Sequence, residues 1–405
     1  MSLATTLLVL SAMLVLGLLS RPLCDRLHLP YSVSMLLIGF IGSEIIVAMG
    51  HDTGIRAELF SNIVFYGLLP VLIFESAFHI DADALLDELR SVLLLSIPVL
   101  VLSTFVAAIL LYHGIGHPVG FPWMAALLCG ALLSATEPSA ILPLLRRSGV
   151  PKRARILLEG ESLFSDGTAI VFFGILLYLA THPQEHITTA DIIARFLIVF
   201  FGGMACGLFV GVGFLWLARH FRDPVIHAAI TLISAYSSYL IAEVWLGVSG
   251  VMAVLIAAIV IGRLVRADQD QAGLAFVDRL WQFNAFFAGS LVYLLMGVTI
   301  TVAMFEQRWL AMLIGIGAVI VARALGILVV SPLLNLGRPR RLSWRDRGVL
   351  AWGGLRGAVT LALALSIPVS LDYWWTIQSI AFGVVVFSLF AQAPGMRWLV
   401  YEPDA

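Results

Sequence analysis

Long apolar runs of about 20 residues alternate with short polar segments along the whole chain. A helix needs about 20 apolar residues to cross a bilayer, and only helices or closed barrels satisfy the backbone there. The runs are too long and continuous for barrel strands. The pattern therefore predicts an all-α membrane protein with about thirteen transmembrane helices, at residues 2–20, 31–49, 60–78, 91–113, 123–145, 156–180, 192–218, 225–245, 248–263, 276–303, 309–334, 347–367 and 373–396.

The composition agrees with a membrane protein and excludes several other classes. Of 405 residues, 60% are hydrophobic and only 12% are charged, and the mean hydropathy is +1.00. A net charge of −1 gives no reason to expect a nucleic-acid partner. The three cysteines (Cys24, Cys129 and Cys206) lack the CxxC spacing of a metal site. No polar stretch exceeds about a dozen residues, so we expect a single polytopic domain over 1–405 with no soluble C-terminal domain.

Basic and non-basic loops alternate along the chain. Arginines and the lysine gather around residues 21–26, 146–155, 219–222, 263–279 and 338–347, whereas the loops around 51–59, 113–122, 181–191 and 306–308 have few. Loops rich in Lys and Arg stay in the cytoplasm. The pattern predicts an outside N-terminus, a cytoplasmic C-terminus and an odd number of spans.

Charged residues inside the predicted spans are the candidates for function. A charge within a membrane costs at least ~2.5–3.5 kcal/mol, so such residues usually mark a pathway, a relay or an internal ion pair. Six stand out: Glu75, Glu137, Glu161, Asp166, Arg323 and Arg356. Glu75 has a second interpretation, as a helix-end residue that reaches water.

The segment GESLFSDGTAIV (160–171) places two acids in one span. Ser162 and Asp166, four residues apart, share a helix face, whereas Glu161 points about 140° away from Asp166. This geometry favours Asp166 and Ser162 facing a water-filled cavity while Glu161 pairs with a cation. Arg323, in the middle of its span, is the predicted partner, and Arg356 is the alternative.

Two spans contain helix breakers. Pro138 follows Glu137 in the fifth span, and Gly353, Gly354 and Gly357 surround Arg356 in the twelfth. Non-helical backbone is tolerated in a membrane only where it is buried or lines a cavity. Paired interruptions in two halves of a chain are typical of transporters with inverted repeats. Simple kinks are the alternative.

A series of motifs resembles the cation/proton antiporter family, in its prokaryotic sodium/proton exchanger branch related to animal exchangers. The motifs are LPVLIFESAF, SATEPSAIL, LLEGESLFSDGTAIVFF, YLIAEVWLGVSGVMAV, FNAFFAGSLVYLLMGV and WGGLRGAVTLALALSIP. The resemblance implies two inverted six-helix repeats with two interrupted, crossing helices. It also implies a homodimer in the inner (cytoplasmic) membrane, with a mobile core that includes about 60–180 and 276–367.

The resemblance also assigns roles. Asp166 is similar to the family's proton and cation carrier, and Ser162 and the Thr136 carbonyl to its ligands. Glu161 and Arg323 match a buried structural ion pair, and Arg356 matches the arginine of the second crossing helix.

Three further positions belong to the expected binding site. Glu137 matches an acid that lies near the site or caps a half-helix, and Glu75 matches a glutamate reached through water. The chain departs from the family in having Glu137 where relatives have Asp, and Ser165 where they have Asn.

The expected chemistry is competition between two ligands for one carboxylate. Na⁺ prefers oxygen ligands, which Asp166, Ser162 and Thr136 supply, and loss of water around Asp166 favours its protonated form. We expect exchange of Na⁺, or Li⁺, for H⁺ without net charge movement, and no cofactor. K⁺/H⁺ exchange is the strongest alternative, followed by a cation channel or a non-transporting ion sensor. An enzyme is least favoured, because no nucleophile and base pair is visible.

Overall fold

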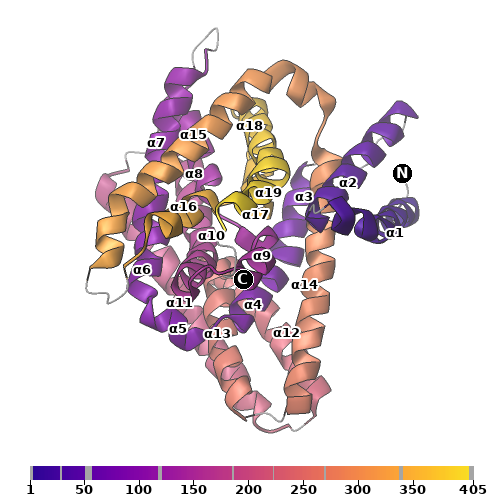
Figure 1. The fold of residues 1–405 in the computed structure, drawn as a ribbon, viewed down its shortest axis with the longest axis vertical. Coiled ribbons are helices and arrows are strands. Elements are labelled where there is room, and N and C mark those ends of the chain that lie inside the picture. The colour runs from indigo at the N-terminus through magenta and orange to yellow at the C-terminus, as the bar shows by residue number, and fades with distance from the viewer. Residues whose placement is uncertain are drawn as a thin grey trace. The chain divides into compact units, whose positions relative to one another are not determined.

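The computed structural model describes residues 3–27, 30–50, 57–116, 121–184, 187–221, 223–268, 271–336 and 341–400. All regular structure in these ranges is helical (Figure 1). The α-helices are α1 (Leu3–Leu27), α2 (Tyr31–Ala48), α3 (Ala57–Asn62), α4 (Leu69–His79), α5 (Ala82–Asp87), α6 (Leu89–Leu94), α7 (Leu100–Gly114), α8 (Trp123–Ser134), α9 (Leu142–Arg147), α10 (Lys152–Thr181), α11 (Thr189–Ala218), α12 (Pro224–Leu240), α13 (Gly250–Asp268), α14 (Gln271–Thr299), α15 (Val302–Asn335), α16 (Trp344–Trp352), α17 (Ala358–Leu365), α18 (Trp374–Phe387) and α19 (Ala393–Gly395). The π-helical segments are η1 (Ile63–Leu68), η2 (Leu95–Val99), η4 (Ile241–Trp245) and η5 (Ser388–Gln392), and the 3₁₀ segments are η3 (Pro138–Ala140) and η6 (Met396–Trp398).

Many of these helices are long and apolar enough to cross a membrane. Within the described ranges there are nine: Tyr31–Ala48, Phe60–His79, Leu89–Gly114, Lys152–Thr181, Thr189–Ala218, Pro224–Trp245, Gly273–Thr299, Val302–Asn335 and Trp374–Trp398. Leu10–Cys24 and Gly250–Arg263 are shorter apolar helices. The predicted spans 123–145 and 347–367 are broken into shorter pieces. An all-α, multi-pass architecture is confirmed, while the count of thirteen stays a prediction.

The chain forms two compact units. Unit 1 contains Met1–Ser61, Glu88–Ser165 and Ser290–Ala405, and unit 2 contains Asn62–Asp87 and Asp166–Gly289. The long helix α10 contributes its first half to unit 1 and its second half to unit 2.

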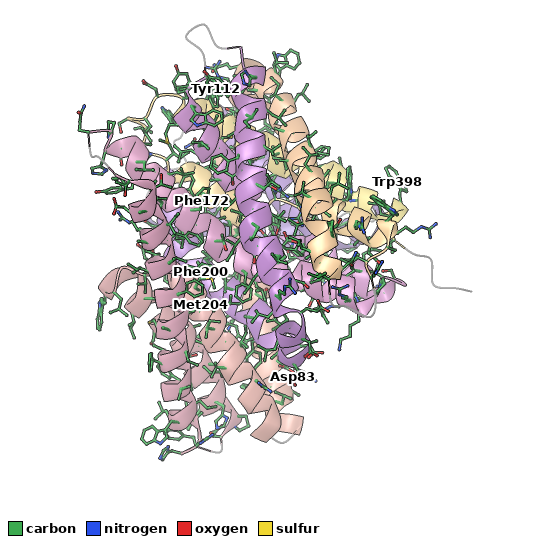
Figure 2. The ribbon with its side chains drawn as sticks, turned by 90° about the vertical axis from the view of Figure 1, so that its left-hand side faces the viewer. Asp83, Tyr112, Phe172, Phe200, Met204 and Trp398 are labelled. Atoms are coloured by element: carbon green, nitrogen blue, oxygen red, sulfur yellow. The ribbon has the colours of Figure 1, made fainter. Side chains whose placement is uncertain are left out.

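In unit 1, α7 packs against α8 and α15, and α15 packs against α18. Figure 2 shows α7 and α15 side by side, with Tyr112 near the end of α7. Small residues allow close approach between helices in membranes: a Cβ added at Gly130 of α8 would lie 2.5 Å from the Thr104 carbonyl oxygen of α7. The short helix α17 packs against α8 and α18, so both interrupted segments lie in this unit.

In unit 2, α13 packs against α4, α11 and α12. Aromatic stacking joins α4 to α14, where the Phe74 and Trp281 ring centroids are 4.3 Å apart. The Trp281 indole donates to Thr231 Oγ1 of α12 at 2.9 Å. Its buried polar atom therefore has a partner, as a buried tryptophan requires.

Some helices extend beyond their predicted ends, because polar residues flanking the apolar run are also helical. α10 begins at Lys152, four residues before the predicted span 156–180, and has 30 residues, so Asp166 lies at its middle. Long basic side chains extend their apolar stems along a helix while the charge stays in water, which explains the extra turn. Parts of the loops that determine the predicted orientation, at 51–56, 117–120, 185–186, 222 and 337–340, lie outside the described residues.

Candidate functional site

The first break in a helix of unit 1 covers residues 135–137, between α8 and η3. Ala135 is extended and Glu137 has φ −130° and ψ 87°, because a residue before proline is pushed out of helical geometry. The break frees the Thr136 carbonyl, which accepts a hydrogen bond from Ser162 Oγ at 2.7 Å. A hydroxyl of α10 is thus already bound to the carbonyl predicted as an ion ligand.

The second break covers residues 353–357, between α16 and α17, and is bonded to the first. The Glu137 amide donates to the Leu355 carbonyl at 2.8 Å. A Cβ added at Gly357 would collide with the Glu137 carboxylate, so a larger residue here would displace that carboxylate. A Cβ at Gly354 would lie 2.9 Å from Arg323 Nε. The glycines around Arg356 therefore make room for charged side chains.

Glu137 caps the helix that follows the second break. Its Oε2 accepts from the Ala358 amide at the start of α17 at 2.7 Å, and its Oε1 accepts from Tyr293 Oη at 3.1 Å and from Ser139 Oγ at 3.2 Å. The first amides of a helix have no partner within it, and the helix dipole favours a negative charge there. The carboxylate therefore stabilises the N-terminus of α17.

Arg356 caps the C-terminal end of α8, the helix that precedes the first break. Its Nε donates to the Leu133 carbonyl of α8 at 2.5 Å, and its Nη1 donates to the Gly354 carbonyl. In an unbroken helix the Leu133 carbonyl would accept from the amide of Glu137. A cation is favoured at a helix C-terminus, so each break carries the charge that caps the other break's helix.

Glu161 and Arg323 contact each other through both oxygens and both terminal nitrogens. Arg323 Nη2 donates to Glu161 Oε2 at 2.7 Å, and Nη1 to Oε1. Nη2 also donates to the Leu350 carbonyl in α16 at 3.0 Å. Exposed fractions of 1% for Glu161 and 4% for Arg323 place the pair out of contact with water. Of the two arginines considered, Arg323 is the one that contacts Glu161.

Ser165 joins a cluster of hydroxyls at the first break. Its Oγ lies 3.1 Å from Thr136 Oγ1, accepts from the Thr136 amide at 3.4 Å and donates to the Ser162 carbonyl at 3.1 Å. Ser165 therefore ties α10 to Thr136 with a neutral hydroxyl.

Unit 2 holds the other two acids predicted for the site. Asp166, partly buried, follows Ser162 by one turn of α10. Glu75 lies on α4, where Oε1 is 3.4 Å from His79 Nδ1, and His79 Nε2 is 3.3 Å from Asp278 Oδ1. Glu75 therefore belongs to a group of titratable side chains that includes a histidine.

Unit 1 brings together most of the predicted site, namely Thr136, Glu137, Pro138, Glu161, Ser162, Ser165, Arg323, Gly353, Gly354, Arg356 and Gly357. Sequence reasoning missed Tyr293, whose phenol binds Glu137, because a lone tyrosine in an apolar span carries no charge signal. It also missed Ser388 and Gln392, which contact the second break. Gln392, a polar residue in an otherwise apolar run, was the one signal in the sequence that could have indicated this pair.

Comparison with known proteins gives relatives over nearly the whole chain. Residues 9–401 match the family described as "Sodium/hydrogen exchanger, transmembrane". The chain is 35% identical to the Na⁺/H⁺ antiporter ApNhaP of Aphanothece halophytica over 397 residues, which is 97% of this chain and 73% of that protein. It is 32% identical to the low-affinity Na⁺/H⁺ antiporter NhaS1 of a Synechocystis strain, covering 95% of this chain and 72% of that protein.

A solved structure shares the fold. The sodium proton antiporter MjNhaP1 from Methanocaldococcus jannaschii superimposes with a TM-score of 0.81 at 22% identity, covering 98% of both chains. At this identity the likeness concerns the arrangement of helices alone.

Proposed function

The chain belongs to the sodium/hydrogen exchanger family, and from this premise we propose that it exchanges Na⁺ for H⁺ across the cytoplasmic membrane. The family resemblance read from the motifs is confirmed, and with it the prediction of a secondary transporter instead of an enzyme. One observation carries the proposal to particular residues: a carboxylate, Asp166, lies at the middle of a 30-residue apolar helix.

Asp166 is the proposed carrier of both cation and proton. Ser162 precedes it by one helical turn and binds the Thr136 carbonyl at 2.7 Å, and this hydroxyl and this freed carbonyl are the further oxygen ligands proposed for Na⁺. Ser165 and Glu137 hold Thr136 and the neighbouring backbone in place, and Glu75 supplies a further acid on α4. Na⁺ and H⁺ compete for Asp166. Because the carboxylate binds only one of them at a time, movement of one ion in one direction is coupled to movement of the other in the opposite direction.

One carboxylate that holds either one Na⁺ or one H⁺ gives an electroneutral cycle. The proposed architecture for this cycle is thirteen transmembrane helices in two inverted repeats, in a homodimer with the N-terminus outside. A core that includes about 60–180 and 276–367 moves against the remaining helices and exposes Asp166 to each side in turn.

Proton flux in proteoliposomes tests the proposal. We expect Na⁺ or Li⁺ gradients to drive H⁺ movement, with no change when the membrane potential is clamped. Flux driven by K⁺ in preference to Na⁺ would favour K⁺/H⁺ exchange, current driven by voltage a channel, and ion binding without flux a sensor.

The carrier residue is tested by Asp166→Asn, which cannot ionise. We expect complete loss of exchange with normal membrane insertion. Asp191→Asn is the matched control, because Asp191 is an exposed aspartate in the capping box at the start of α11. An Asp166→Asn protein that still exchanges would rule out this carrier.

A further inference from the structure

The π-helical segment η5 (Ser388–Gln392) lies against the second break and contacts it through two buried polar side chains. Ser388 is 1% exposed and Gln392 is 5% exposed. The segment is a π-helix because the Ala393 amide bonds to the Ser388 carbonyl, five residues back. Such π-helical turns inside α-helices are frequent at functional sites.

These two side chains replace the hydrogen bond that the broken helix has lost. In an unbroken helix the Arg356 amide would donate to the Trp352 carbonyl, four residues before it. Instead, the Arg356 amide donates to Ser388 Oγ at 3.2 Å, and the Trp352 carbonyl accepts from Gln392 Nε2 at 2.7 Å. The donor and the acceptor separated by the break are therefore both satisfied by η5.

The two side chains are also bonded to each other, in a chain with a single direction. Ser388 Oγ donates to Gln392 Oε1 at 3.0 Å, and Gln392 Nε2 donates a second time, to the Gly354 carbonyl at 3.4 Å. The Trp352 indole returns a hydrogen bond to the Gln392 carbonyl at 2.8 Å. Every polar atom of the Gln392 side chain has a partner, so its orientation is fixed.

The second break in turn positions the first. Arg356 Nε holds the Leu133 carbonyl, and the Leu355 carbonyl holds the Glu137 amide. Leu133 and Glu137 lie on either side of Thr136, whose carbonyl is the proposed ligand. A shift of residues 353–356 would therefore be transmitted to both sides of Thr136.

We propose that Ser388 and Gln392 are positioning residues for ion binding, which hold the second break so that Arg356 and Leu355 fix the Thr136 carbonyl. This inference rests on the proposed exchange function and extends it to a helix that supplies no ligand of its own. Neither side chain touches the ion, and each acts through the backbone of residues 352–356.

The test is Na⁺-driven H⁺ flux in proteoliposomes of the full chain, measured over a series of Na⁺ concentrations. Ser388→Ala removes the hydroxyl, and Gln392→Met keeps the length of the side chain without its amide. Partners that orient metal ligands cost about 10-fold in affinity or more when removed, so we expect each variant to raise the KM for Na⁺ about 10-fold while Vmax changes less. Ser388→Thr, which keeps the hydroxyl, should retain the wild-type KM.

Ser379→Ala is the matched control, because Ser379 is a buried serine of α18 whose hydroxyl, in the part of the chain that the structure describes, bonds only to the Trp375 carbonyl of its own helix. It should leave KM unchanged. An unchanged KM in Ser388→Ala and Gln392→Met would overturn the proposal. So would a loss of melting temperature or of insertion in both variants without a change in the KM of the folded protein, since that would assign the pair to folding alone. Failure of the proposed function would be visible separately, as absence of Na⁺-driven flux in the wild type.

Discussion

The two breaks in unit 1 differ in what binds their freed backbone. At the first break the Thr136 carbonyl accepts from the Ser162 hydroxyl, and the Thr136 amide donates to the Ser165 hydroxyl. At the second break the Gly354 carbonyl accepts from a guanidinium and an amide, those of Arg356 and Gln392. The Thr136 peptide groups are thus held by neutral hydroxyls, whereas the Gly354 carbonyl is held by a charged guanidinium together with a carboxamide.

We interpret the first break as the place for an ion, and the second break with the Glu161–Arg323 pair, which is bonded to α16, as the frame that supports it. A hydroxyl that donates to a carbonyl can rotate, and both oxygens can then face a cation. A guanidinium bound to a carbonyl repels a cation and is strongly bonded because it is charged. We therefore expect the Thr136 carbonyl of the first break to be open to Na⁺, and the Leu133 and Gly354 carbonyls, which Arg356 binds, to be closed to it. The reciprocal caps by Glu137 and Arg356 join the two breaks, so we expect them to respond together to substitutions in the frame.

The largest expected effect is on the frame, in Glu161→Gln. The substitution leaves the Arg323 guanidinium buried without its counter-ion, and breaking a buried pair in this way costs ~3–5 kcal/mol. The free energy of unfolding or the melting temperature of the purified protein measures it.

Glu159→Gln provides the control on the same helix. Glu159 Oε1 lies 3.3 Å from Arg146 Nη2, and the Arg146 side chain is 59% exposed. A solvated ion pair of this kind contributes ~1 kcal/mol or less to stability. Equal melting temperatures for the Glu161 and Glu159 variants would show that the buried pair is not part of a stabilising frame.

The next largest effect is expected at the first break, in the variant Ser162→Ala. Loss of the hydroxyl removes one proposed ligand and the hydrogen bond to Thr136, and we expect a rise in the KM for Na⁺ of about 10-fold, or ~1.4 kcal/mol. Stability should fall by only ~1 kcal/mol, the usual contribution of one hydrogen bond. Flux at varied Na⁺ together with thermal unfolding separates the two quantities.

Ser96→Ala is the control for this variant, because Ser96 is a buried serine whose hydroxyl, within the described residues, bonds only to the Val92 carbonyl of the same helical segment. If Ser162→Ala lowered stability as much as Glu161→Gln and left KM unchanged, the distinction between the two breaks would be lost.

The helical spans and the break positions could be predicted from sequence because both depend on local properties. Apolar length determines a span, and Pro138 or the glycines around Arg356 determine an interruption. The separate faces of Glu161 and Asp166 also follow from helix periodicity alone. The structure adds that Arg323, and not Arg356, contacts Glu161.

The contacts across the breaks could not be predicted, because they join residues far apart in sequence. Tyr293 and Gln392 lie 156 and 38 residues from the groups they bind, Glu137 and Gly354, and neither carries a charge that would mark it in an apolar run. The role of Ser165 was also open, since a hydroxyl has many possible partners and only packing selects Thr136.

The smallest effect is expected in Glu137→Gln, which tests whether the charge of this first-break residue stabilises α17, the helix after the second break. The variant keeps one oxygen for the Ala358 amide, presents an NH₂ group to the Tyr293 and Ser139 hydroxyls, which can accept from it, and removes the negative charge at the start of α17. A charge at a helix terminus contributes ~0.3–1 kcal/mol, so we expect a stability loss of this size and little change in the KM for Na⁺. Glu137→Ala, which removes the cap itself, should cost about 1 kcal/mol more. A rise in KM for Glu137→Gln as large as that for Ser162→Ala would place the Glu137 carboxylate among the ion ligands. The charge would then act in ion binding at the first break and not in capping α17.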